Sequence, residues 1–312
     1  MKFRIFKSFL IPLFFVLASC ASVPVSQKAC VTKTDQRLFW RIDGVDKKGK
    51  PSVIYIQGTI HVGDERLTSV SDEVLEAFTL SDRIVAEVSS RDFIKTGFYA
   101  VRLAMPNKDG KIVTDYLNEE QKATLDYYLK DDSAYNGLIQ MNPMMVENYL
   151  TIKFAEESGL KSEDGLDMVF YKMAKRRGKP VEGLDALETQ MNLLAYGDYD
   201  FQINYLRHSL DQLKEAKEKN INPMLELYEL YLADDIENLN LLLEEEDEDD
   251  QKLPEEFDNF KNKITLERNQ EWVGDIKKYL NEGGTTFIFT GCAHWLGKDS
   301  VFELLRQDGV IY

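Results

Sequence analysis

Histidine, cysteine and tryptophan are all scarce in this chain, which has three of each among its 312 residues. Glycine and proline occur 18 and eight times, too seldom for a collagen-like or low-complexity architecture. Basic residues are in deficit, because 38 Lys and Arg face 54 Asp and Glu and leave a formal net charge of −16. Phosphate binding needs clustered cations, so we expect no nucleic acid as a partner. Hydrophobic residues still make up 44% of the chain, which is enough for a globular core and excludes disorder throughout.

The chain begins with a basic segment and a short apolar stretch, Phe9–Ala18. This stretch is too short to cross a bilayer of about 30 Å as a helix and is typical of a cleaved secretory signal. It ends in Leu17-Ala18-Ser19-Cys20, which resembles the lipobox of bacterial lipoproteins, where the cysteine is acylated and becomes the new N-terminus. We therefore predict a signal peptide over residues 1–19, a lipid such as palmitate on Cys20 and a tether over residues 20–36. The alternative is an ordinary signal peptide with an incidental cysteine.

The predicted mature chain is too acidic to adhere to anionic headgroups by charge, so the lipid must supply the membrane attachment. We expect a lipid-anchored protein of the bacterial cell envelope that faces the periplasm or the exterior. Two further cysteines, Cys30 and Cys292, remain. An oxidising compartment would allow them to pair, but we favour two free thiols.

Strand patterns stand at both ends of the mature chain. Residues 38–42 and 52–56 predict a β-hairpin, residues 83–88 a short buried strand that ends in Glu87, and residues 285–290 a strand near the C-terminus. Between them the pattern is mostly helical. We therefore predict an α/β fold in a domain over residues 37–312. Its compact sheet core is assembled from both ends of the chain, with a large helical insertion over about residues 92–280.

Apolar residues at three- and four-residue spacing place helices within this insertion. The predicted ranges are 144–155, 166–174, 206–213, 224–243 and 255–280, with a short strand at 181–184 and a further helix at 300–306 after the insertion. Seven consecutive carboxylates, Glu244 to Asp250, predict a solvated loop. A calcium site of the EF-hand type is excluded there, because its loop needs spaced ligands and a central glycine.

An internal repeat is the most informative feature. Gly58-Thr59-Ile60-His61 and Gly291-Cys292-Ala293-His294 each follow an apolar strand and precede a second glycine and a helix. With 18 Gly and three His in the chain, random placement predicts about 0.17 such Gly-x-x-His spacings. The third histidine, His208, lies in a predicted helix, and we interpret it as a surface residue.

The layout of the repeat predicts a site. In α/β sheets, ligands bind beyond the carboxyl ends of the strands, and a glycine there permits a sharp turn and a close backbone approach. If the two strands are neighbours, both imidazoles face one crevice, where they can bind a divalent metal or act as acid and base. Glu87, at the end of a third strand, would add a carboxylate. The alternative is that each histidine caps its strand end through hydrogen bonds.

These motifs resemble the TraB/PrgY/GumN superfamily, which includes the Tiki proteases, and the bacterial GumN-like branch in particular. Further matches are Gly178-Lys179-Pro180, Gly183-Leu184-Asp185 and Glu267-Arg268-Asn269 with Trp272. The resemblance implies a core related to erythromycin-esterase-like proteins and a metal-dependent hydrolase, with His61, Glu87 and His294 as metal ligands and Glu87 and Arg268 as catalytic residues. The branch usually has Gly-Leu-Glu where this chain has Asp185, which puts a direct role for that carboxylate in doubt.

Several functions are compatible with these residues. The first is a membrane-anchored, metal-dependent hydrolase that acts on peptides or proteins and uses Mn, Co or Zn as its ion. In this function Arg268 would stabilise an oxyanion. The alternative for Arg268 is a structural salt bridge. The second is a non-catalytic lipoprotein that binds a ligand, a metal or haem. The third is a surface protein that docks through its acidic segment. Cys292 as a nucleophile is less favoured. The oligomeric state, the metal and the substrate stay open.

Overall fold

A six-stranded mixed sheet forms the core of the protein. The computed structural model describes residues 28–95, 110–244 and 255–312, and the strand order is β1-β2-β3-β6-β4-β5. The strands are β1 (Cys30–Lys33), β2 (Phe39–Val45), β3 (Pro51–Thr59), β4 (Arg83–Ala86), β5 (Val181–Gly183) and β6 (Gly284–Gly291). β2 and β3 pair antiparallel, as the hairpin prediction requires. β3, β6, β4 and β5 are mutually parallel. The predicted α/β class is therefore confirmed.

The pairing of β3 with β6 joins the two ends of the domain. The two strands match residue for residue from Ser52 and Gly284 to Thr59 and Gly291. Both strands are rich in β-branched and aromatic residues, which suits a strand covered on both faces. The ring of Phe287 packs against Phe78 on one neighbouring element and Phe39 on another, at 5.3 and 6.0 Å between centroids. The two Gly-x-x-His units therefore leave the sheet at the same edge.

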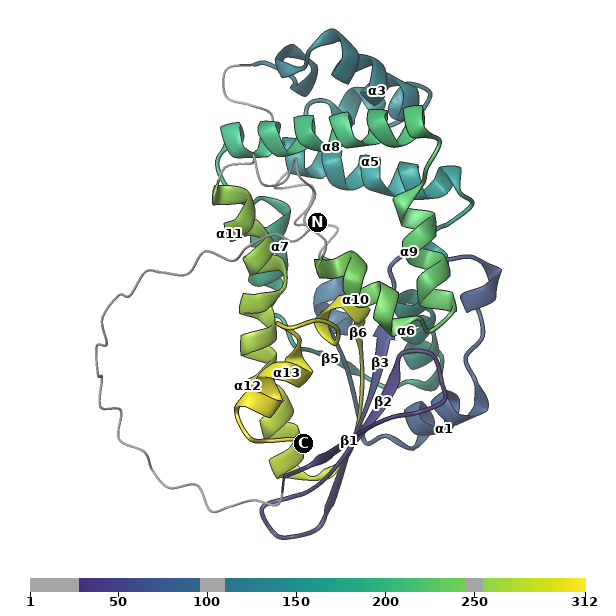
Figure 1. Cartoon of the computed structure of the whole chain (residues 1–312), viewed down its shortest axis with the longest axis vertical. Helices are drawn as coiled ribbons and strands as arrows, with labels where there is room; N and C mark the ends of the chain where they lie inside the picture. Colours follow the sequence, from purple (N-terminus) through teal and green to yellow (C-terminus); the bar gives the residue numbers. More distant parts are fainter. Residues whose placement is uncertain (1–27, 96–109, 245–254) are drawn as a thin grey trace, which may run out of the picture.

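Helices cover both faces of the sheet. Figure 1 shows α12 and α13 on one side of it and α1 and α6 on the other. The α-helices are α1 (Asp72–Leu80), α3 (Glu119–Leu129), α4 (Tyr135–Leu138), α5 (Pro143–Glu157), α6 (Leu166–Arg177), α7 (Leu187–Leu194), α8 (Tyr199–Lys219), α9 (Pro223–Leu232), α10 (Ile236–Glu244), α11 (Glu255–Ile264), α12 (Leu266–Glu282) and α13 (Val301–Gln307).

The helical insertion forms a layer with its own core beyond one edge of the sheet. α3, α5 and α8 pack together there, at the top of Figure 1. Their shared apolar cluster includes the fully buried Leu125, Val146 and Leu206. This cluster is separate from the one around the sheet, to which another part of the insertion contributes Phe170 and Val181. Because β5 comes from the insertion, the sheet is not assembled from the two ends of the chain alone, as was predicted. The prediction of a mostly helical middle section is confirmed.

Two of the predicted helices are each split in two. The range 224–243 contains α9 and α10, because Asp234 adopts a positive φ of 56° and its carboxylate accepts hydrogen bonds from Leu38 N and Lys33 Nζ. The range 255–280 contains α11 and α12, which meet at Thr265. Within the acidic run, residues 245–250 lie outside the described residues.

The folded chain begins earlier than predicted. Residues 1–27, with the proposed signal peptide and Cys20, lie outside the described residues. Cys30–Lys33, within the range predicted as a tether (20–36), instead form β1. Just before it, the buried Ala29 pairs with Ile311 near the C-terminus. The boundary at residue 36 was therefore wrong, because this segment completes the edge of the sheet.

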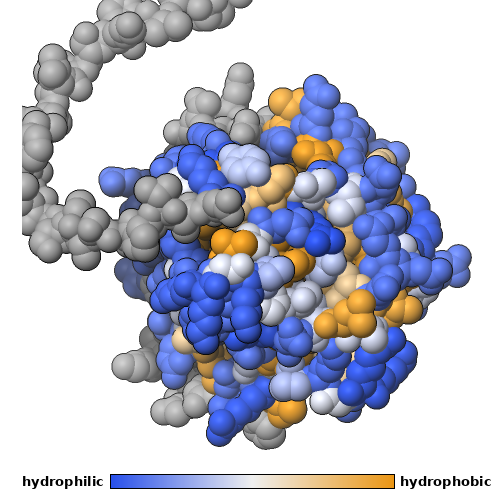
Figure 2. Space-filling model, turned by 90° about the horizontal axis from the view of Figure 1, so that it is seen from below, coloured by the Kyte–Doolittle hydropathy of each residue, from blue (hydrophilic) through white to orange (hydrophobic). Residues whose placement is uncertain are grey.

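The surface of the protein is mainly polar on the face that Figure 2 shows. On the face seen in Figure 2, hydrophilic residues predominate and apolar ones are scattered singly or in small groups. Among the described residues, no helix is both long enough and apolar enough to cross a bilayer.

Lys179, from the Gly178-Lys179-Pro180 motif, has a structural role. Its Nζ donates hydrogen bonds to the carbonyl oxygens of Phe78, Thr79 and Ser81, at 3.2, 2.7 and 2.7 Å. These carbonyls belong to the last turn and C-cap of α1. An ammonium group there satisfies the free carbonyls and interacts favourably with the helix dipole.

Replacing Lys179 with methionine should therefore destabilise the protein. Hydrogen bonds to charged groups contribute about 1.5–3 kcal/mol, so we expect the free energy of unfolding to fall by about 2 kcal/mol. Urea denaturation followed by circular dichroism measures it. An unchanged midpoint would show that water replaces the ammonium group at no cost.

Candidate functional site

Each of the four parallel strands is followed at its carboxyl edge by a polar residue, and we refer to the place where these residues meet as the crevice. Glu87 comes directly after β4, while His61 and Asp185 come two residues after β3 and β5. His294 closes the 3₁₀ turn Cys292–His294 that follows β6. This edge is the expected position for a ligand site in a parallel sheet.

Gly291 marks the centre of this crevice. A Cβ atom placed on Gly291 would lie 3.2 Å from Glu87 Oε1, 3.7 Å from His294 Cδ2 and 3.9 Å from His61 Nε2. All three side chains thus come within 4 Å of one point. A side chain at Gly291 would fill the space between them, so the glycine keeps the site open. The two imidazoles thus lie close together, as expected if β3 and β6 are neighbours.

His294 is buried and held in a single orientation. Its Nδ1 lies 2.6 Å from Asn269 Oδ1, and Asn269 Nδ2 donates to Asp299 O. The amide oxygen is therefore the acceptor, and Nδ1 carries the proton. Burial lowers the pKa of His294 to about 4, so the ring is neutral at physiological pH with a free lone pair on Nε2. The Trp272 ring packs against it at 4.2 Å between centroids.

His61 is held in a similar way but faces solvent. Its Nδ1 lies 3.4 Å from Asp167 Oδ2, and 67% of its side chain is exposed. The surrounding protein atoms oppose a charge on the ring, but the hydrogen bond and charge of Asp167, together with the charge of Glu87, outweigh them and raise the pKa of His61.

Glu87 is an ionised carboxylate with both oxygens engaged. Oε1 accepts a hydrogen bond of 2.8 Å from Gly291 N, and Oε2 one of 2.5 Å from Arg268 Nη2. Burial favours the neutral acid, but nearby cationic groups, above all His294 when charged and Arg268, lower the pKa of Glu87 to about 2. Glu87 thus fastens the start of the second Gly-x-x-His turn to helix α12.

Arg268 lies between two carboxylates and not in the open crevice. Besides Glu87 it contacts Asp185, with Nε 2.9 Å and Nη2 2.7 Å from Oδ2, and its Nη1 donates to Ile264 O. The residue is only 6% exposed. The salt-bridge alternative for Arg268 is therefore the arrangement observed, and most of its five donors are used within the protein.

The sequence reasoning missed one site residue and misplaced another. Asp167, in the first turn of α6, has no motif around it; only its position at a helix start behind His61 distinguishes it. His208 is half-buried against Phe257, with 6.1 Å between ring centroids, and belongs to the helical insertion. It was therefore not a plain surface residue.

The two cysteines within the described residues, Cys30 and Cys292, are free thiols, as favoured from the sequence. Cys30 is partly exposed and Cys292 is buried. Burial raises the pKa of Cys292 to about 12, so its thiol stays protonated at neutral pH and is a poor nucleophile.

A metal ion would find two nitrogen donors in this crevice. Among the described residues, no group of three His, Cys, Asp or Glu side chains is arranged to hold an ion. Both histidines nevertheless have Nδ1 next to an oxygen and no described hydrogen-bond partner at Nε2, which is the arrangement typical of histidine ligands. Each imidazole thus presents one nitrogen donor, whereas both oxygens of Glu87 are engaged by Gly291 and Arg268.

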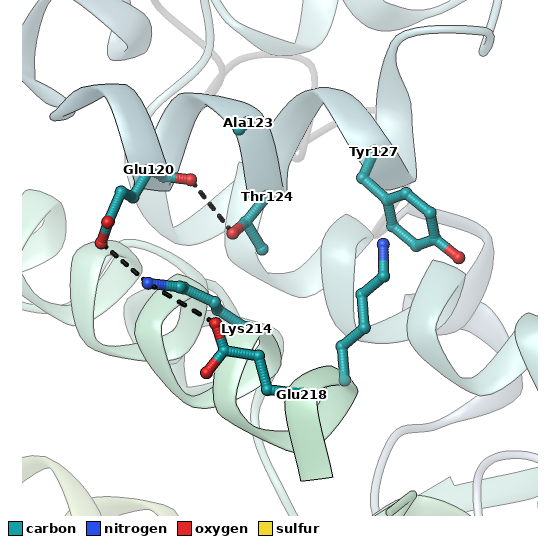
Figure 3. Close-up of a pocket in the computed structure, with 7 residues that line it drawn as sticks. Glu120, Ala123, Thr124, Tyr127, Lys214 and Glu218 are labelled. Carbon is teal, nitrogen blue, oxygen red and sulfur yellow. Dashed lines mark hydrogen bonds and ion pairs between the residues drawn. The ribbon is translucent and has the colours of Figure 1, made fainter. Parts of the chain in front are cut away.

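A groove among the described residues lies elsewhere, between α3 and α8. It has a volume of about 470 Å³ and is lined by Glu120, Tyr127, Lys214 and their neighbours. Figure 3 shows Lys214 between Glu120 and Glu218, with Tyr127 at the other end. The paired charges satisfy one another, and none of the crevice residues lines this groove.

Comparison with known proteins assigns the chain to a family. The model of the TraB/PrgY/gumN family matches residues 38–312, so the chain belongs to this family. It is similar to an uncharacterized protein of Treponema pallidum (strain Nichols), with 25% identity over 297 residues that cover 93% of this chain and 86% of the relative. No solved structure matches the chain. The resemblance inferred from the Gly-x-x-His units is thus confirmed.

Replacing Asp167 with asparagine should lower the pKa of His61. The raised pKa means that His61 stabilises the fold below pH 6.5 and that this contribution is lost as the pH rises through about 9. Without the carboxylate, both the titration midpoint and this window shift to lower pH. The Hε1 resonance of His61, followed by NMR against pH, measures the change, and an unaltered midpoint would contradict the role of Asp167.

Proposed function

We propose that this protein is a metal-dependent hydrolase, peptidase-like in its chemistry. One observation carries the proposal: His61, Glu87 and His294 come within 4 Å of a single point beside Gly291. Three groups capable of binding an ion or moving a proton rarely converge by accident at the edge of a sheet where ligands bind.

The two imidazoles would hold a divalent ion, with Mn, Co and Zn as the candidates. Each offers Nε2, while Asp167 or Asn269 fixes the ring through Nδ1. When bound, such an ion supplies Lewis acidity to a carbonyl group and to a water molecule. The large exposed fraction of His61 leaves an approach for an incoming ligand, and Glu87 supplies negative charge close to the ion.

The remaining residues prepare the crevice. Arg268 keeps Glu87 ionised by pairing with it in a buried setting. We therefore propose that Arg268 positions the Glu87 carboxylate and contributes positive potential near a developing oxyanion. In this role Arg268 does not bind the substrate directly. Asn269 keeps the proton of His294 on Nδ1. The peptide as substrate class rests on the resemblance to the Tiki branch.

The decisive experiment replaces His61 and His294 together with alanine. We expect the purified wild-type protein to bind about one divalent ion by elemental analysis and the double variant to bind none. In a screen of peptide substrates with added Mn, Co or Zn, hydrolysis should occur only with the wild type. Full metal occupancy in the double variant would exclude the proposed site.

A second candidate function is a non-catalytic lipoprotein that captures a ligand, a metal or haem. It is favoured by the engagement of both Glu87 oxygens with Gly291 and Arg268, which leaves no obvious free base. Metal binding without hydrolysis in the same screen would support this candidate over the first.

We also propose that the protein is attached to the cell envelope through a lipid on Cys20. The small residues directly before this cysteine, at the end of the apolar stretch, support it. Replacing Cys20 with serine should move the protein from the membrane fraction to the soluble fraction and abolish labelling by palmitate. A palmitate-labelled variant would refute the assignment.

A further inference from the structure

Asp185 is a fully buried carboxylate that collects hydrogen bonds from three residues. Its side chain has no exposed surface. Arg268 Nε donates to Oδ2 at 2.9 Å, Gln190 Nε2 donates to Oδ2 at 2.6 Å, and Trp272 Nε1 donates to Oδ1 at 2.7 Å. A buried charge is costly unless it is paired and hydrogen-bonded, and a fully satisfied buried network fixes its members in place.

Two of these donor residues, Arg268 and Trp272, also contact residues of the crevice. Arg268 also binds Glu87 Oε2, and Glu87 Oε1 accepts from Gly291 N, so one branch ends on the turn that carries His294. The second branch runs through Trp272, whose ring packs against His294 at 4.2 Å between centroids. The backbone N–H of Asp185 also donates to Glu87 O at 2.8 Å.

We propose that Asp185 is the positioning residue of the site: it holds Arg268 and Trp272 so that Glu87 and His294 meet beside Gly291. Because no part of its side chain is exposed, Asp185 acts through these partners and does not touch a ligand. This inference deepens the proposed function by naming the residue that holds the site residues in place. Its metal-binding test rests on the proposed function.

Zinc affinity measured by calorimetry tests this role. Asp185→Asn keeps the size of the side chain but removes the charge and one of the acceptor oxygens. Residues that hold metal ligands in place typically contribute 10- to 100-fold to metal affinity, so we expect a loss within this range. Trp272→Phe keeps an aromatic ring beside His294 but removes the indole N–H together with the five-membered ring that carries it. It should lower the affinity about tenfold and serves as the test if Asp185→Asn does not fold.

Lys179→Met is the matched control, because it loosens α1 without touching the crevice. Its zinc affinity should equal that of the wild type. An equal loss in Lys179→Met and Asp185→Asn would mean that zinc affinity follows general stability, and it would overturn the inference. Wild-type affinity in a folded Asp185→Asn protein would overturn it too.

A second measurement needs no metal. In the wild type, the ring current of Trp272 displaces the Hε1 resonance of His294 in the NMR spectrum. The displacement should change in Asp185→Asn and stay the same in Lys179→Met; an unchanged resonance in Asp185→Asn refutes the role of Asp185. If the wild-type protein binds none of Mn, Co and Zn, the proposed function fails, and this resonance still decides the role of Asp185.

Discussion

The parallel pairing of β3 with β6 is the constraint on which the rest of the molecule depends. It places Thr59 beside Gly291, so the two Gly-x-x-His units leave the sheet at neighbouring points. A shift of the register by one residue would turn the side chains of one strand to the opposite face. The pairing is strongly specified, because Ile54, Ile56, Phe287 and Ile288 are completely buried and would lose their apolar contacts in another register.

Charge balance is the second constraint. The site contains a buried carboxylate, Asp185, a half-buried one, Glu87, and one buried guanidinium that binds both. Removing the cation would leave two charges of the same sign without a partner in a poorly solvated place, which is strongly destabilising. Asp185 and Arg268 therefore bear on both stability and the site, and stability must be measured alongside function in any variant of them.

The sequence predicted the parts of the fold that are determined locally. Apolar strands followed by glycine identified β3 and β6, and the Gly-x-x-His repeat placed His61 and His294 in one crevice. β1 was missed because four residues at a sheet edge carry little pattern, and their pairing with β2 is a tertiary effect. The break at Asp234 was missed for the same reason, since its carboxylate binds Leu38 N from a distant segment.

The residues of the site also divide into those found from local sequence patterns and those found only from tertiary contacts. Glu87 was found because it ends a recognisable strand, whereas Asp167 lies on a helix of the insertion and meets His61 only in the folded chain. A direct role for Asp185 was doubted because the related branch usually has a glutamate there. Its indirect role depends on three hydrogen-bond partners that only the structure brings together. Sequence motifs thus identify the side chains that directly follow strands. Which of these side chains contact one another depends on the packing of distant segments.

A zinc titration followed through the three histidine Hε1 resonances tests the central claim most directly, because His208 serves as an internal control in the helical insertion. If the two strand-end imidazoles share one pocket, the resonances of His61 and His294 will shift together and reach their end point at one equivalent, while that of His208 stays in place. Movement of only one of the pair, or separate end points for the two, would contradict a shared site.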